Sequence, residues 1–264
     1  MIRLSKIADE RREAGAVECW CLHGAVGLAS DWRETGAQLA AHGVGSRAVD
    51  MWRFLDCCPM PLDAFGTALC AEAAGEVFRG SGRVLVGYSM GGRLALHALL
   101  ADPQPWQAAV IVSAHPGLED AGERAARRAV DADWASRALA GDWASFLTDW
   151  NAQPVLADAA MGGDQARASR LRQRRREIAR SFVDWSLGAQ QPLWERLAEI
   201  RIPVLWVTGA LDQKFSRLAS RAVARMPDAS HLVIDGAGHR VPWQNPSGFC
   251  EALANFTRTG SHGQ

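Results

Sequence analysis

The sequence has no excess of charge of either sign and no hydrophobic run long enough to span a membrane. Lysine plus arginine and aspartate plus glutamate number 29 each, so the composition does not indicate a surface for nucleic acid. The first residues, Met1 to Ala16, are charged and lack the apolar core of a signal peptide, which disfavours export. We therefore expect a cytoplasmic protein without a membrane or a nucleic-acid partner.

Signals for disulfides and metal ions are also missing. The six cysteines show neither C-x-x-C nor another metal-ligand spacing, and we expect them to act as small apolar residues in a reducing compartment. Tyrosine occurs once, whereas tryptophan occurs 11 times. Several tryptophans lie outside the apolar runs typical of strands, which leaves room for a pocket lined by aromatic rings.

The most informative stretch that is present is an apolar run, 84–86, followed by Gly-Tyr-Ser-Met-Gly and then by a segment of helical character. This is a G-x-S-x-G nucleophile elbow in the strand–turn–helix context that the motif requires. Gly87 and Gly91 are expected where a Cβ would clash with the neighbouring strand and helix. Ser89 should then project at the carboxyl edge of the sheet, beside the first free N–H groups of the helix. A chance match among 25 glycines is the alternative, which the flanking segments disfavour.

Strand-like and helix-like segments alternate along most of the chain. We predict further strands at 17–22, 46–51, 108–114, 203–208 and 231–234, and helices at 31–41, 62–78 and 246–257. Such alternation predicts an α/β fold with a mostly parallel sheet and helices on both faces.

The character of the sequence changes between residues 118 and 200. Strand-like runs vanish, and tryptophan and arginine become frequent. We interpret this segment as four or five helices inserted between two strands. The predicted organisation is a core of residues 1–117 and 201–264 with a helical lid at 118–200.

A serine needs a histidine to take its proton and an acid to orient that histidine. In this arrangement the acid and the histidine follow the serine in chain order, each just beyond a strand end. Asp212 follows the strand near 203–209, and His239 follows the strand that ends near Asp235. The predicted catalytic triad is therefore Ser89, Asp212 and His239.

Other titratable residues compete for these roles. Asp228 and Asp235 are expected in turns, and His97 is expected to pack on the inner side of the helix after the elbow. The oxyanion site should consist of two backbone N–H groups, those of Met90 and Ala25.

Beyond these motifs the chain resembles the MenH family, the 2-succinyl-6-hydroxy-2,4-cyclohexadiene-1-carboxylate synthases of menaquinone biosynthesis. The likeness covers nearly the whole chain after about residue 20. It rests on Leu22-His23-Gly24, Gly87-Tyr88-Ser89-Met90-Gly91-Gly92-Arg93, His115-Pro116-Gly117-Leu118, Glu123-Arg124-Ala125-Ala126-Arg127, Asp149-Trp150, Gln153-Pro154-Val155, Gln191-Pro192, Asp212-Gln213-Lys214-Phe215 and Ala237-Gly238-His239. Many relatives share the elbow and the histidine loop, whereas the other segments are more specific in combination.

The resemblance implies an α/β-hydrolase fold and a lyase that eliminates pyruvate from a substrate with several carboxylates. His239, oriented by Asp212, would deprotonate Ser89, and the alkoxide would take a proton from a substrate carbon. The backbone donors would stabilise enolate-type charge. Such a reaction requires no metal, no cofactor and no acyl-enzyme.

The resemblance also implies a pocket for a small anionic substrate, because guanidinium groups bind carboxylates through two parallel hydrogen bonds. By position, the substrate-binding residues would be Tyr88, Arg93, Arg127, Trp150, Arg172, Lys214 and Phe215. Arg172 is chosen from the arginine-rich run 170–176, and Arg93 has a structural ion pair as its alternative role.

Three departures from the family pattern leave the substrate open. Asp50-Met51-Trp52-Arg53-Phe54-Leu55 replaces a D-L-P-G-H-G loop, Ala25 stands where an aromatic residue is frequent, and 240–243 reads Arg-Val-Pro-Trp. We expect the first two near the mouth of the site. The alternative function is a serine hydrolase, namely a carboxylesterase, a thioesterase or a carbon–carbon bond hydrolase. A non-catalytic ligand-binding protein is a third interpretation, which an intact triad disfavours.

Overall fold

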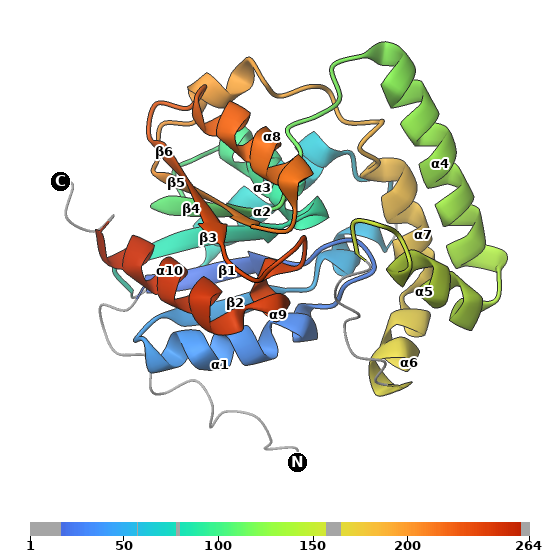
Figure 1. Ribbon diagram of the computed structural model, residues 1–264, viewed down its shortest axis with the longest axis horizontal. Coiled ribbons are helices and arrows are strands. Elements are labelled where there is room, and N and C mark those ends of the chain that lie inside the picture. Colours follow the sequence, from blue (N-terminus) through green and yellow to red (C-terminus); the bar gives the residue numbers. More distant parts are fainter. Residues whose placement is uncertain (1–16, 57, 78–79, 157–164, 260–264) are drawn as a thin grey trace.

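The computed structural model describes residues 17–56, 58–77, 80–156 and 165–259. Within these residues the centre is one parallel sheet with the strand order β2-β1-β3-β4-β5-β6 (Figure 1). The strands are β1 Val17–Leu22, β2 Gly45–Val49, β3 Gly82–Tyr88, β4 Ala108–Val112, β5 Val204–Gly209 and β6 Ala229–Ile234. The predicted α/β fold with a parallel sheet is confirmed.

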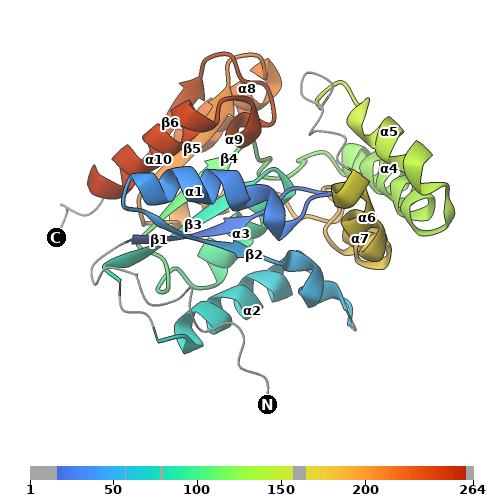
Figure 2. The ribbon, with the colours of Figure 1, turned by 90° about the horizontal axis from the view of Figure 1, so that it is seen from below.

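Helices cover both faces of the sheet, as parallel strands require (Figures 1 and 2). Every residue of β4 is buried, and its side chains alternate between two apolar clusters. One face packs against α1 (Arg33–Ala41) and α10 (Pro246–Thr259). The other packs against α2 (Leu62–Gly75), α3 (Met90–Ala101) and α8 (Gln213–Val223).

Among the described residues, four α-helices follow β4 and precede β5, and they gather at one end of the sheet (Figure 2). They are α4 Ala121–Ala140, α5 Trp143–Asn151, α6 Gln165–Gln173 and α7 Arg175–Asp184, and the short 3-10 helix Arg196–Glu199 comes after them. We call α4–α7 the insertion. Aromatic rings of three of these helices pack together and continue the apolar cluster of one sheet face into the insertion: Trp134, Phe146, Trp150 and Phe182.

Three short helical segments add to the helices that the sequence predicted. They are the 3-10 helices Ala29–Trp32 and Met51–Leu55 and the helix α9, Val241–Gln244. The second of them, Met51–Leu55, lies in a segment for which the sequence predicted no helix. The Asp50 carboxylate accepts the Trp52 N–H at 3.2 Å and caps the turn, and the Trp52 side chain is buried.

The described cysteines are all free, and four of the five are buried. Cys57 and the segment considered for a signal peptide, 1–16, lie outside the described residues. No helix among the described residues combines the length and the apolar character needed to cross a membrane.

Candidate active site

The elbow after β3 has the close contacts that its two glycines predict. A Cβ on Gly87 would lie 2.5 Å from the Gly91 carbonyl oxygen, and one on Gly91 would lie 2.5 Å from the Leu22 carbonyl oxygen. Ser89 has a φ of 53°, a left-handed conformation that an L-residue adopts only under constraint. The turn thus lifts the Ser89 hydroxyl out of the sheet edge at the start of α3.

The structure brings the three predicted triad residues into one hydrogen-bonded chain. The Ser89 hydroxyl lies 3.1 Å from His239 Nε2, and His239 Nδ1 lies 2.8 Å from Asp212 Oδ2. Asp212 is also the N-cap of α8, because its Oδ1 accepts the Phe215 N–H at 3.2 Å. Asp212 and His239 are buried, so solvent competes little for these bonds.

The histidine loop is held by a residue that the sequence did not single out. The Gln244 side-chain oxygen accepts the Gly238 N–H at 2.9 Å and the Arg240 N–H at 3.0 Å, on either side of His239. The Phe215 ring packs 4.5 Å from the imidazole. Together these contacts fix both the backbone and the ring of His239.

The loop after β1 passes directly beside Ser89. A Cβ on Gly24 would lie 3.6 Å from the Ser89 Cβ, and the next residue, Ala25, lines the same cavity as Met90. Met90 is the first residue of α3, so its backbone N–H has no helical carbonyl one turn back to bond. The positions of Ala25 and Met90 therefore suit two donors to a developing oxyanion.

This loop is supported from beneath by the segment that departs from the family pattern. Trp52 donates from Nε1 to the Gly27 carbonyl at 2.8 Å, and its ring packs 4.7 Å from that of buried His23. Trp52 does not line the cavity. The expectation that 50–53 lies at the mouth of the site is therefore corrected for Trp52, which buttresses the loop.

Backbone strain gathers at the same place. The described residues contain three non-glycine positions with positive φ, and all three line the cavity: Val26 at 51°, Ser89 at 53° and Ser113 at 47°. Ser89 and Ser113 end the neighbouring strands β3 and β4. Such strain persists where the surrounding structure over-determines it, as functional sites do.

Six of the seven predicted substrate-binding residues line the cavity: Tyr88, Arg93, Arg127, Trp150, Lys214 and Phe215. Arg172 does not; it is exposed on α6, and the choice of Arg172 is corrected. The cavity arginine of α6 is Arg167. Five helical residues correspond to a rotation of about 140°, so the two side chains leave α6 in different directions.

Arg167 joins the insertion to the core. Its Nε and Nη2 donate to the two carboxylate oxygens of Asp31 at 2.9 and 2.8 Å, and Nη2 also donates to the Val26 carbonyl at 3.2 Å. Such a two-pronged bond is the strongest kind of side-chain ion pair. It anchors α6 on the loop that carries Ala25.

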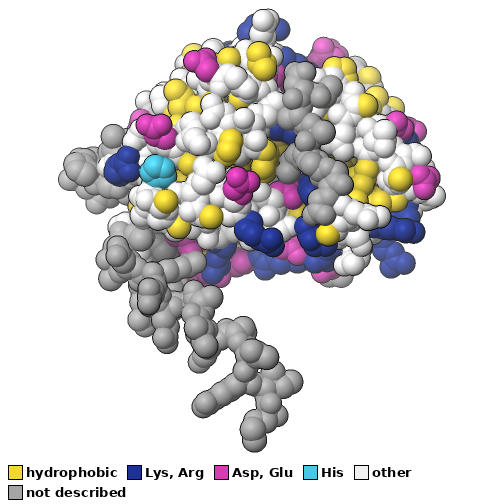
Figure 3. Space-filling view, turned by 60° about the horizontal axis from the view of Figure 1, so that its bottom comes forward, with side chains coloured by type: hydrophobic (Ala, Val, Ile, Leu, Met, Phe, Trp, Pro, Cys, Tyr) yellow, Lys and Arg dark blue, Asp and Glu magenta, His cyan; other side chains and the backbone are white. Residues whose placement is uncertain are grey.

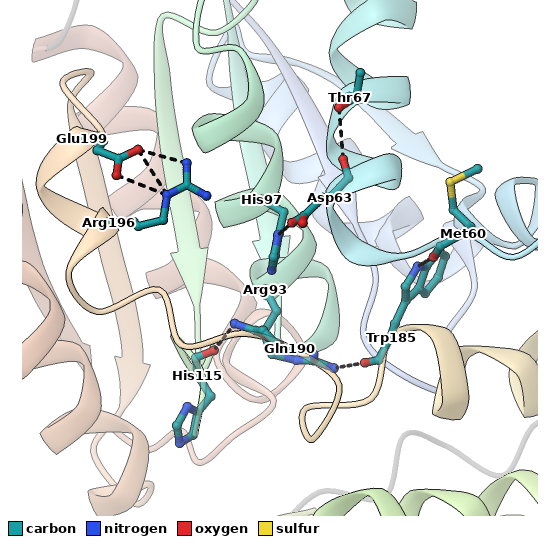
Figure 4. Close-up of polar contacts among 10 residues, drawn as sticks. All are labelled: Met60, Asp63, Thr67, Arg93, His97, His115, Trp185, Gln190, Arg196 and Glu199. Carbon is teal, nitrogen blue, oxygen red and sulfur yellow. Dashed lines mark hydrogen bonds and ion pairs between the residues drawn. The ribbon is translucent and has the colours of Figure 1, made fainter. Parts of the chain in front are cut away.

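Arg93 is buried and bonds only neutral groups among the described residues. Its Nη2 donates to the Trp185 carbonyl at 2.7 Å and its Nη1 to Gln190 Oε1 at 3.1 Å (Figure 4). For the alternative role of structural ion-pair partner, no carboxylate among the described residues lies within ion-pair distance of Arg93. Burial, and next the charge of Arg127, lower the pKa of Arg93 to about 9. The charge of buried Asp131 raises the pKa of Arg93, but Asp131 is bonded by Arg127 Nε at 2.9 Å instead.

The cavity is cationic as a whole. Its lining includes one carboxylate, Asp31, against five cationic side chains: Arg93, Arg127, Arg167, Lys214 and Arg240. Further Lys and Arg side chains lie along the lower edge of the face in Figure 3 and toward the end that carries the insertion. An anion is the ligand that this charge distribution favours.

Two lining residues that were not predicted come from the unusual segment after His239. Arg240 donates to Asn151 Oδ1 of α5 at 2.7 Å. Trp243 donates from Nε1 to the Asp31 carbonyl at 2.9 Å, and its ring packs 4.8 Å from that of Tyr88. The departure of 240–243 from the family pattern was the only sequence signal for them.

The described residues contain no cluster of three or more histidine, cysteine or acidic side chains that could hold a metal ion.

Comparison with known proteins adds relatives to this geometry. The model of the Alpha/beta hydrolase family matches residues 21–252. A 2-succinyl-6-hydroxy-2,4-cyclohexadiene-1-carboxylate synthase of Serratia proteamaculans (strain 568) is 32% identical over 238 residues, 89% of this chain and 91% of the relative. The synthase of that name from Salmonella schwarzengrund (strain CVM19633) is 30% identical over 248 residues, 93% of this chain and 96% of the relative.

Among solved structures, MenH from S. aureus superimposes with a TM-score of 0.83 at 23% identity, over 95% of this chain and 96% of that one. At this level of identity the likeness concerns the fold.

Proposed function

This chain belongs to the alpha/beta hydrolase family and resembles its MenH synthases over about nine-tenths of its length, and from this premise we propose that it is a pyruvate-eliminating lyase. Its substrate would be a cyclohexene that carries several carboxylates and an enolpyruvyl ether. Its product would be 2-succinyl-6-hydroxy-2,4-cyclohexadiene-1-carboxylate, the compound named in the relatives.

The observation that carries the proposal is the state of Arg93. A buried guanidinium without a carboxylate partner among the described residues lines the same cavity as the Ser89 hydroxyl. Burying an unpaired charge is costly, and a bound carboxylate would offset that cost. A polycarboxylate is therefore a better fit to this cavity than a neutral ester.

In the proposed mechanism the triad acts as a base. His239 Nε2 takes the Ser89 proton, and the Ser89 alkoxide removes a proton from a substrate carbon. The electrons of that C–H bond form a carbon–carbon double bond while the C–O bond to the enolpyruvyl group breaks. The leaving enolate takes the proton from the His239 imidazolium and becomes pyruvate.

The backbone donors stabilise the charge that this mechanism develops. The N–H groups of Ala25 and Met90 would bond the substrate oxygen on which enolate-type charge accumulates. A positioned base and an oxyanion site each contribute roughly 10²- to 10⁴-fold in rate.

We include the insertion in the proposal as a cationic lid, residues 118–200, over a core of 1–117 and 201–264. Arg127 and Arg167 come from the insertion, whereas Arg93 and Lys214 come from the core. The anionic substrate would thus be held between the two parts, with its reacting carbon above Ser89.

The test is pyruvate release from the enolpyruvyl substrate, followed by oxidation of NADH through added lactate dehydrogenase. Wild-type protein should turn the substrate over, and Ser89→Ala should lower kcat by at least about 10³-fold with an unchanged melting temperature. No pyruvate from a folded wild-type protein would refute the proposal.

Acyl hydrolysis is the second candidate, and the intact Ser89–His239–Asp212 chain is the observation that favours it. A hydrolase would release p-nitrophenol from p-nitrophenyl acetate in a burst followed by fast steady turnover. A lyase that uses the alkoxide as a base should show only slow release. Measuring both reactions on one preparation separates the two functions.

A further inference from the structure

The segment His115-Pro116-Gly117, which leads from β4 toward the insertion, has no role in the proposed mechanism. Its backbone is clamped to the segment that returns from the insertion. Trp194 Nε1 donates to the Gly117 carbonyl at 2.8 Å, and the Leu193 N–H donates to the Pro116 carbonyl at 2.8 Å. Gly117 has a φ of 120°, and a Cβ there would lie 2.8 Å from the Pro192 Cα. These contacts explain the glycine but not the imidazole.

The imidazole of His115 lines the cavity together with Ser89 and Arg93. In Figure 4 the His115 carbonyl faces Gln190, whose Nε2 donates to it and whose Oε1 accepts from Arg93. The imidazole ring extends away from Gln190. The backbone N–H of Gly117 donates to His115 Nδ1 at 3.0 Å. Since Nδ1 is an acceptor, the ring proton sits on Nε2, for which no partner is found among the described residues.

Three cations from three different helices line the cavity together with this ring, and their charges act on it. They are Arg93 of α3, Arg127 of α4 and Lys214 of α8, and the acid that acts on it is the exposed Glu119. Burial first, and then these cations, lower the pKa of His115 to about 4. The ring is therefore neutral near pH 7. Its Nε2–H can donate a hydrogen bond without adding a positive charge to the cavity.

We propose that His115 binds the anionic substrate, donating from Nε2–H to a carboxylate oxygen held among Arg93, Arg127 and Lys214. This inference rests on the proposed function, which supplies the class of substrate. It adds a neutral hydrogen-bond donor to a cavity whose cations would bind the substrate carboxylates. The bond from His115 is directional, as are those of the arginine forks, and it adds a constraint on the orientation of the carboxylate that the point charge of Lys214 does not supply.

Two substitutions separate this role from a structural one. In His115→Asn, the side-chain oxygen can take the place of Nδ1 and still accept the Gly117 N–H, but the distal donor is lost. In His115→Gln, the amide N–H reaches the place of Nε2, but the bond from Gly117 is lost. His115→Asn thus keeps the hydrogen bond within the protein, and His115→Gln keeps the proposed hydrogen bond to the substrate.

The measurement is succinate binding by titration calorimetry, with melting temperature recorded for each variant. We expect His115→Asn to weaken succinate binding about tenfold without lowering the melting temperature, as for loss of one hydrogen bond to a charged group. His115→Gln should bind within about threefold of wild type and melt at a lower temperature. His97→Gln is the control for the same substitution elsewhere, because His97 is a buried histidine that does not line the cavity.

The opposite pattern, with Asn normal and Gln impaired in binding, would overturn the inference and leave His115 a structural residue. Absence of succinate binding to wild type would overturn it as well, since no carboxylate site would then exist. Succinate binding does not involve elimination. A protein that shows the expected Asn–Gln difference but releases no pyruvate would refute the proposed function and leave this inference standing.

Discussion

The core and the insertion contribute to one cavity in different ways. The core places its functional groups through the backbone: Ser89, Asp212 and His239 each follow the end of a parallel strand, and His239 lies within hydrogen-bond distance of both of the others. The insertion places charge through long side chains on helices, such as Arg127 and Arg167. Chemistry that needs sub-ångström geometry is thus built on the sheet, and recognition of charge is built on the helices.

The two parts are also held together differently. The core buries its central strands between two layers of helices. The insertion shares one apolar cluster with the core, through residues such as Ile178 and Phe182, and is joined to it by polar side chains as well. Arg167 bonds Asp31, and Arg174 bonds Asp50 at 2.8 Å. Arg180 donates to the Leu55 carbonyl at 3.2 Å. Partly exposed polar bonds exchange with water more readily than apolar packing does. Substitutions at these polar side chains of the insertion should therefore lower the free energy of unfolding less than substitutions in the apolar interior of the core.

The largest effect should come from the core. Asp212→Asn replaces the acid that orients His239 by an amide that can present an N–H to His239 Nδ1 and favour the wrong tautomer. We expect kcat for pyruvate release to fall by about 10³- to 10⁴-fold, with KM changed by less than about threefold. Steady-state kinetics measures both. A loss below tenfold would show that the triad geometry is not used in catalysis.

The next largest effect should come from Arg93, where core and insertion meet. Arg93→Met removes the cation, and it also leaves the Trp185 carbonyl and Gln190 without their donor. We expect kcat/KM to fall about 100-fold, mainly through KM, and the protein to be destabilised by about 1–3 kcal/mol. Arg93→Lys is the companion variant. Because it keeps the charge without the planar fork, it should recover part of the stability and little of the KM.

A matched pair within α6 tests the insertion alone. Arg167→Met should raise KM about tenfold, because Arg167 lines the cavity and anchors the loop that carries Ala25. Arg172→Met should leave KM within about twofold, because Arg172 is exposed. Each variant removes one arginine from one helix, so net charge is the same in both. Equal effects on KM would mean that the insertion acts only through its total charge.

The same contrast explains what could be predicted from sequence. In the core, Gly87 and Gly91 and the residues just beyond strands 203–208 and 231–234 are local signals, and topology brings strand ends to one edge. The parallel sheet and the convergence of Ser89, Asp212 and His239 followed from them. The catalytic and substrate-binding roles of these residues stay predictions.

The register of the insertion did not follow from the sequence. Within α6 the buried Leu171 is the one large apolar residue, and Arg167 lies one turn before it on the same helix face. One apolar residue among many arginines is a weak signal, and the partner that fixes Arg167 is Asp31, 136 residues earlier. Arg240 and Trp243 were missed for the same reason, because their partners Asn151 and Asp31 are distant in the chain. Contacts between distant polar side chains leave no periodic trace that a single sequence can reveal.

The smallest expected effect is a difference between the core and the insertion in how folding stability depends on pH. No histidine occurs between residues 118 and 200, whereas the pKa values of His23, His97 and His115 are lowered, foremost by burial. The unfolded chain takes up protons on these residues as pH falls through about 6.5, and the folded protein does not until its lower pKa is reached. The contribution of these histidines to the free energy of unfolding is therefore fully present above pH 6.5 and is lost progressively below it.

For His115, whose folded pKa is about 4, the loss between pH 7.5 and pH 5.5 should be about 1 kcal/mol. His115→Asn removes this titration, so its free energy of unfolding should fall by about 1 kcal/mol less than that of wild type over the same interval. Urea unfolding at the two pH values measures the difference, and Arg172→Met, a substitution in the insertion, should behave like wild type. If His115→Asn lost as much stability as wild type, the imidazole would already be protonated in the folded protein at pH 5.5, and the cations around it would not be acting on it.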